Sequence, residues 1–100
     1  MGTIEARIAA LGLELPPALV PPPGVVLPFE FVRVVGDRAV FSGHGPQASD
    51  GSVSGPFGEV GTDVTVDEAY AAARSTGLSI LGSLQRALGD LDRIVGWVRV

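Results

Sequence analysis

The chain has 100 residues, 46% of them hydrophobic and 18% charged, which suits one folded domain and argues against a disordered segment. Its net charge of −4 comes from eleven carboxylates and seven arginines without lysine, too few cations to form a basic face for nucleic acid. The lack of cysteine excludes disulfides and thiolate chemistry, and a single histidine excludes a histidine-rich metal site, so we expect neither metal nor cofactor.

The first predicted element is a short helix within residues 1–14. Ile4, Ile8 and Leu11 recur at helical spacing and form one apolar stripe, and Gly12 follows where a C-terminal cap belongs. A helix of this length is not stable alone, so it must dock on another element.

A proline-rich arm follows over residues 15–29. It holds six of the eight prolines, which fix φ and remove backbone donors, so an extended arm is expected and a helix or an inner strand is not. Its apolar side chains predict that the arm packs on the rest of the domain: Leu19, Val20, Val25, Val26 and Leu27.

Residues 30–43 predict a β-hairpin, with Gly36-Asp37 as a two-residue turn of the primed type. Residues 44–64 are rich in glycine and predict a long loop that crosses the sheet. A loop of this length in a small domain is more often functional than idle.

Residues 65–89 predict the longest helix. Thr65 and Glu68 fit a capping box at its start, and Gly89 can end it. Helical spacing predicts one buried face: Ala69, Tyr70, Ala73, Gly77, Ile80, Leu81, Leu84 and Leu88. The opposite, exposed face is predicted to carry polar residues: Arg74, Ser75, Gln85 and Arg86.

Residues 94–100 predict a final strand, because they are rich in β-branched and aromatic side chains. Trp97 within it is expected in the core or in a contact between subunits. The order of elements predicts one α+β domain over residues 1–100, a small sheet with a long helix across one face.

His44 is the main candidate for chemistry, since it lies where the hairpin runs into the loop. It could act as an acid or a base, or it could be a partly exposed loop histidine. Ser42, two residues earlier, is more plausible as a binding hydroxyl than as a nucleophile. The glycines around His44 match a dinucleotide-binding string, but Pro46 prevents the helix that this motif requires. Carboxylates near the helix ends are better explained as caps and solvated turns: Asp63, Asp67, Glu68, Asp90 and Asp92.

Membrane and export signals are not evident in the sequence. Every apolar run is interrupted by proline, glycine or charge before the roughly 18–20 residues that a membrane helix needs. The first fifteen residues lack a basic region and include Glu5 and Arg7, unlike a signal peptide. A cytoplasmic protein is therefore expected.

Six strings together resemble the reactive intermediate deaminase family, also called the RidA, YjgF or L-PSP family. In chain order they are IEAR (4–7), LGLELPP (11–17), VFSGHGP (40–46), GEVG (58–61), DVTVDEAYAAAR (63–74) and LGDLDRIV (88–95). The first two are typical of one bacterial branch of the family. The strings extend over most of the chain.

The resemblance implies a chorismate-mutase-like α+β fold, a homotrimer with clefts between subunits, and hydrolytic deamination of reactive enamines or imines from amino-acid metabolism. In the family, an arginine binds the carboxylate of a small metabolite and a positioned water completes the hydrolysis. The resemblance further implies that four residues here wall the cleft: Phe29, Ser42, Gly43 and His44.

The family's carboxylate-binding arginine, second long helix and closing strand belong to a C-terminal portion beyond Val100. No arginine here lies in the corresponding motif, so the catalytic residues stay unassigned. We expect either a fragment of a longer member or a short variant completed by association, with slow or absent turnover by this chain alone. Two alternatives remain, a non-catalytic ligand-binding or regulatory trimer and, against the acidic charge, a ribonuclease or translation inhibitor.

Overall fold

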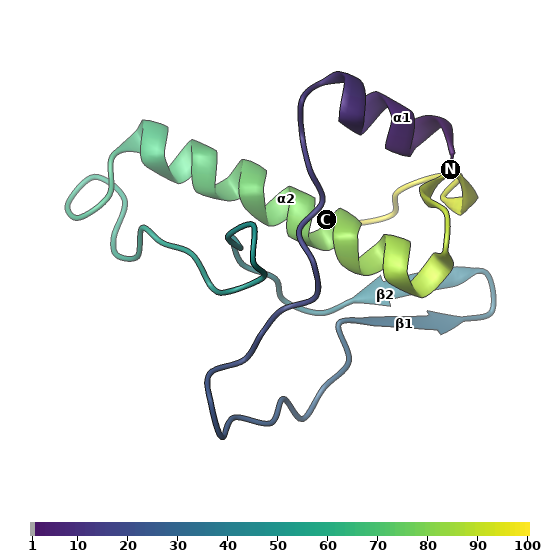
Figure 1. The fold of residues 1–100 in the computed structure, drawn as a ribbon, viewed down its shortest axis with the longest axis horizontal. Coiled ribbons are helices and arrows are strands. Elements are labelled where there is room, and N and C mark those ends of the chain that lie inside the picture. Colours follow the sequence, from purple (N-terminus) through teal and green to yellow (C-terminus); the bar gives the residue numbers. More distant parts are fainter. Residues whose placement is uncertain (1) are drawn as a thin grey trace.

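The computed structural model describes residues 2–100, so the first residue of the predicted 1–14 helix lies outside the described part. A long helix lies across a two-stranded antiparallel sheet, which confirms the predicted α+β class (Figure 1). In chain order the elements are α1 (Thr3–Ala10), β1 (Val32–Val35), β2 (Arg38–Phe41), α2 (Val66–Leu88) and the 3₁₀ turn η1 (Leu91–Arg93). No helix of the described chain is long and apolar enough to cross a membrane.

The hairpin has a tight turn, as its sequence predicts. Val35 pairs with Arg38, and Gly36 between them has a φ of 60°. Asp37 does not adopt a positive φ, which fits a type II′ turn and excludes type I′. Beyond the named strands, the amide of Ser42 donates to the Phe31 carbonyl at 3.0 Å, so the pairing continues to the edge of the following loop.

Helix α2 has the two ends that its sequence predicts. The Thr65 hydroxyl accepts from the Glu68 amide at 3.1 Å, and the Glu68 carboxylate accepts from the Thr65 amide at 3.0 Å. This capping box satisfies donors that would otherwise lack partners in the first turn. Gly89 ends the helix with a φ of 84°, a conformation that favours glycine.

The buried face of α2 differs from the predicted one. Leu84 is buried as expected, but Tyr70 is 76% exposed and Ala73 is also exposed. The buried positions are instead mostly small: Ser79, Gly82, Ser83 and Leu84. The reason is close backbone approach, since a Cβ on Gly82 would lie 3.1 Å from the carbonyl oxygen of Pro16 in the arm.

Small residues therefore face the arm and the turn after the hairpin, while the larger side chains of Ile80, Leu81 and Leu88 are only half-buried. Ser75 and Gln85, predicted on the exposed face, are half-buried in the structure. Helical periodicity alone could not distinguish these faces, because both repeat at three- and four-residue spacing.

The predicted strand over residues 94–100 does not form. After η1 the chain continues in extended backbone at Ile94, with φ −79° and ψ 117°, but no described strand pairs with it. β-branched residues favour extended backbone, but a strand also needs a neighbour to take its amides and carbonyls. Val95 and Val98 are consequently almost fully exposed.

The arm and the long loop lack regular structure but are tied together. The amide of Val20 donates to the Gly51 carbonyl at 3.2 Å, and the Gln47 side chain donates to the Pro17 carbonyl at 3.0 Å. The arm does not pack along its whole length as expected, since Val26 is 87% exposed. Its first half therefore forms the packed part.

The apolar core is thin, and the chain exposes much of its surface. Among the described residues, the buried hydrophobic side chains are Val64, Leu84 and Leu91. The accessible surface is 7127 Å², against about 5,400 Å² expected for a compact protein of this mass. The radius of gyration is 14.5 Å, against about 12.7 Å for a compact domain of this length.

Candidate functional site

A hollow of about 160 Å³ lies between the arm, the start of β1, the turn after β2 and helix α2. Aromatic and apolar side chains form most of its wall, with a few polar groups among them, as is usual in small-molecule sites. Its lining residues are Leu19, Phe29, Phe31, Gly43, His44, Gly45, Pro46, Gln47, Val53 and Ser83.

Three of the four residues predicted to wall a cleft line this hollow, namely Phe29, Gly43 and His44. Ser42 is not among the lining residues, because its hydroxyl donates to the backbone carbonyl of Glu30 at 2.9 Å. The backbone carbonyl of Ser42 instead accepts from the His44 ring. Ser42 therefore positions the histidine and does not present its side chain to the hollow.

The His44 ring is held between aromatic side chains. Its centroid lies 5.2 Å from that of Phe31 and 6.1 Å from that of Phe41. Phe29 in turn packs edge-to-face on Phe31, with centroids 5.4 Å apart. These contacts limit rotation of the imidazole, so the hollow has a fixed aromatic wall beside a fixed heterocycle.

A chain of hydrogen bonds runs from the histidine to α2. Nδ1 of His44 lies 2.8 Å from the Ser42 carbonyl oxygen, and Nε2 lies 2.8 Å from the Ser83 hydroxyl. Since a carbonyl oxygen can only accept, Nδ1 carries the proton in the neutral ring and Nε2 is the acceptor. The Ser83 hydroxyl therefore donates to His44.

Arg86 completes this chain. Its Nη2 donates to the Ser83 oxygen at 3.2 Å and its Nη1 donates to the Pro16 carbonyl at 3.1 Å. Partial burial lowers the pKa of the Arg86 guanidinium from its ordinary value. Both partners are neutral, so the positive charge of Arg86 stands at the end of a polarised line of groups leading to the hollow.

This arrangement can hold a small ligand and influence its protons. The Ser83 hydroxyl and the Gln47 side chain suit polar atoms, and the phenyl rings suit an apolar or planar group. Arg86 does not line the hollow, but its positive charge lies one hydrogen bond behind Ser83 and favours an anionic ligand. His44 Nε2 is a proton acceptor in a restrained position, and a proton from a ligand can reach it through the Ser83 hydroxyl.

Sequence analysis missed Ser83, and it placed Arg86 on the exposed face of the helix, where the structure also has it. The signal that could have identified Ser83 is a second stripe of small residues at helical spacing, formed by Ser75, Ser79, Gly82 and Ser83. The contact with Arg86 follows from their separation of three residues on one helix. The contact with His44 spans 39 residues and has no local signal.

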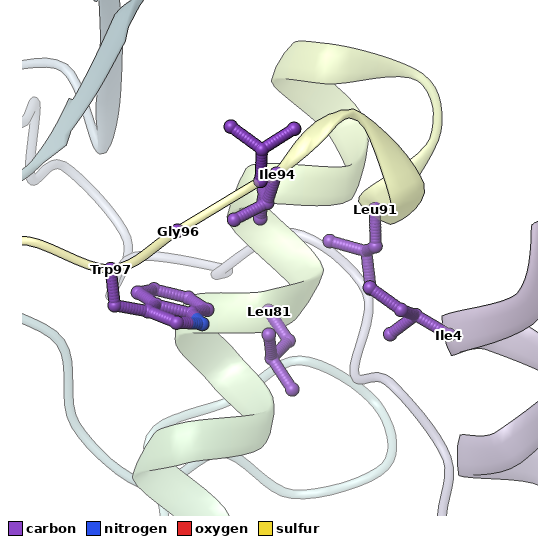
Figure 2. A pocket seen from close by; sticks show the side chains of 7 residues that line it. Ile4, Leu81, Leu91, Ile94, Gly96 and Trp97 are labelled. Atoms are coloured by element: carbon purple, nitrogen blue, oxygen red, sulfur yellow. The ribbon is translucent and has the colours of Figure 1, made fainter.

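A second hollow, of about 230 Å³, has a mostly apolar wall. Figure 2 shows the Trp97 ring beside Leu81 of α2, with Leu91 and Ile4 pointing toward each other farther along. Trp97 is 54% exposed, so it does not lie in the core of this chain, and the alternative of a contact between subunits stays a prediction. This groove offers little for catalysis and suits apolar contact.

The fold is of the YjgF or L-PSP type, an assignment supported by a solved structure that matches 93% of this chain with a TM-score of 0.79. That structure is of a protein from Shewanella oneidensis MR-1, provisionally described as an endoribonuclease, and its sequence is 35% identical. A curated relative, Protein TCP17 of Trypanosoma cruzi, is 36% identical over 93 residues. No protein-family profile matches this chain.

The chain spans little more than half the length of these two relatives. It covers 54% of TCP17 and 58% of the Shewanella protein. The two come from very different organisms, so they do not single out the expected bacterial branch. The similarity concerns the fold and the sequence of the shared part.

Proposed function

We propose that this chain belongs to the reactive intermediate deaminase family and that the hollow beside His44 binds a small carboxylate-bearing enamine or imine. The observation that carries the proposal is the line of hydrogen bonds from Arg86 through Ser83 to His44. It places a hydroxyl and an imidazole on the wall of one small hollow, with a cation one hydrogen bond behind the hydroxyl. The fold similarity and the six sequence strings support the family.

The reaction would be hydrolysis of a carbon–nitrogen double bond. An enamine first takes a proton at carbon to give its imine. Water then adds to the imine carbon, its displaced proton reaches nitrogen, and the adduct releases ammonia and leaves a carbonyl. In this proposal the charge of Arg86, one hydrogen bond behind Ser83, favours an anionic substrate in the hollow, and the His44–Ser83 pair accepts and returns the proton of the water.

Binding can be tested by titration with pyruvate, the carbonyl product of 2-aminoacrylate hydrolysis. We expect pyruvate to shift the imidazole resonances of His44, which are unambiguous because the chain has one histidine. Arg86→Gln should weaken binding at least tenfold, whereas Arg38→Gln, an exposed change in β2, should not. Equal affinities in wild type and both variants would overturn the assignment of this hollow.

Turnover separates the deaminase from the alternative of a non-catalytic binding module. The assay follows release of pyruvate and ammonia from 2-aminoacrylate generated in place by a lyase. Acceleration that is lost in His44→Ala and kept in Ser79→Ala supports the deaminase. Pyruvate binding without acceleration supports the binding module.

Ribonuclease activity is the weaker candidate despite the description of the Shewanella protein. Seven arginines against eleven carboxylates leave little attraction for a polyanion. We expect no cleavage of single-stranded RNA at low salt, where electrostatic binding is strongest. Cleavage that disappears in His44→Ala would reverse this preference.

We further propose that the chain assembles with copies of itself, as a trimer. Support comes from about 1,700 Å² of surface per chain beyond that of a compact protein of this mass, about twice the roughly 800 Å² that one partner buries in a standard interface and so enough for two neighbours. The apolar groove beside Trp97 and the exposed Tyr70 of α2 are part of that surface. Sedimentation equilibrium should give a mass near three chains, and a monomer at all concentrations would refute it.

A further inference from the structure

Three carboxylates meet where the start of α1 reaches the end of α2 and η1, a junction visible beside the N-terminus in Figure 1. They belong to Glu5 of α1, Asp90 before η1 and Asp92 within it. One oxygen from each lies within 4.8 Å of the other two. Glu5 is 85 or more positions from the two aspartates in the sequence, and the fold brings all three into one compact acidic cluster, which we call the carboxylate cluster.

Glu5 is the unusual member of the carboxylate cluster, because it is only 6% exposed. Its Oε2 accepts from the Leu91 amide at 3.1 Å and from the Gln85 side chain at 3.3 Å. Its Oε1 is buried and has no hydrogen-bond partner. A buried carboxylate oxygen without a partner is costly, so its presence points to a positive group that completes the site.

The other two carboxylates have structural partners but keep capacity for a ligand. Asp92 accepts from the amides of Thr3 and Ile4 at 2.7 and 2.9 Å, and Asp90 accepts from the Asp92 amide through Oδ1. Each carboxylate oxygen has two lone pairs, so these bonds leave room for another contact.

The neighbouring arginine does not pair with the carboxylate cluster. The guanidinium of Arg93 donates to the Leu88 carbonyl at 2.9 Å. Backbone amides hold the pKa of Glu5 and that of Asp92 below their ordinary values, so both are ionised near neutral pH. Like charges at this spacing repel unless a cation screens them.

We propose that Glu5, Asp90 and Asp92 bind a calcium ion that links α1 to η1. Calcium takes carboxylate oxygens at about 2.4 Å in a flexible geometry, so one ion can touch three oxygens that lie within 4.8 Å of one another. Magnesium, with metal–oxygen distances of about 2.1 Å, requires a tighter and more regular set. Water completes the coordination on the exposed side.

The binding test uses terbium as a luminescent substitute for calcium. Trp97 shares a groove with Ile4 and Leu91, the sequence neighbours of Glu5 and Asp90, so its excitation should sensitise terbium bound there. We expect saturable emission that calcium displaces at lower concentration than magnesium. Asp90→Asn and Glu5→Gln should each weaken binding at least tenfold, and Asp37→Asn in the hairpin turn should not.

Stability provides a second readout that does not depend on the probe. At 100 times its Kd, calcium should raise the Tm by on the order of 10 °C relative to sodium chloride of equal ionic strength. The rise should be reduced in Asp90→Asn, which keeps the shape of the side chain. No saturable binding, or equal binding and equal Tm rise in wild type and Asp90→Asn, would overturn the site. Stronger displacement by magnesium would overturn the assignment to calcium.

Discussion

Ser79 and Ser83 lie one turn apart on α2, and we expect replacement by alanine to have opposite effects on stability at the two positions. Ser83 is 6% exposed and its hydroxyl takes part in two hydrogen bonds, to His44 and from Arg86. Ser83→Ala removes both and leaves the acceptor nitrogen of His44 without its donor. At about 1 kcal/mol for each bond, we expect the free energy of unfolding to fall by about 2 kcal/mol.

Ser79 is the matched control, since it is fully buried and its hydroxyl has no hydrogen-bond partner. Ser79→Ala removes an unsatisfied polar group and should leave the stability unchanged or raise it by up to about 1 kcal/mol. The two substitutions change the helix propensity by the same amount, because each replaces serine with alanine inside the same helix. The difference in stability between the variants therefore isolates the hydrogen bonds.

Urea unfolding followed by circular dichroism measures both variants. The midpoint of Ser83→Ala should fall below that of wild type, and that of Ser79→Ala should not. Nitrogen-detected NMR of the single histidine should also show the proton on Nδ1 in the wild-type protein. Equal stabilities of the two variants, or a proton on Nε2 of the neutral ring, would refute the hydrogen-bond chain.

Three further predictions concern the helix ends. Gly2→Ala should destabilise the protein by about 1–3 kcal/mol and loosen α1, because the new Cβ would overlap the Asp90 carboxylate and lie 2.7 Å from Asp92 Cγ; amide exchange across α1 measures it. Thr65→Ala should cost about 1 kcal/mol in urea unfolding, and Thr65→Ser should cost much less, because serine keeps the capping hydroxyl. The lowered pKa of Asp92 means that its contribution to stability is complete above the ordinary carboxyl pKa and is lost as the pH falls through the lowered one. Asp92→Asn should therefore reduce the loss of Tm between pH 7 and pH 3 in chelator-treated protein, and an undiminished loss would contradict this.

Local sequence was sufficient for the elements whose determinants are neighbours in the chain. The capping box of Thr65 and Glu68 and the turn at Gly36 follow from residues a few positions apart, and both are present. The final strand was predicted wrongly because pairing depends on a distant partner, which side-chain preference at residues 94–100 does not reveal. The prediction of the buried face of α2 was wrong for a related reason, because the close approach of the arm at Pro16 requires small residues on the helix.

The candidate site shows the same division. The sequence by itself predicted His44 as a candidate residue, because a single imidazole after a hairpin is recognisable without a structure. It could not give the partners of that imidazole, since Ser83 lies 39 residues away and Glu5 lies 85 or more residues from the aspartates that it meets.

The sequence thus determined which kinds of chemistry the composition argues against, the order of the helices and the hairpin along the chain, and the helix caps. These features depend on composition, local geometry and charge. The tertiary structure alone decided which face of α2 is buried, which groups contact His44, and where the three carboxylates converge. The physical reason is that hydrogen bonds and packing act between atoms close in space, and helical or strand periodicity specifies only how residues are placed along one element.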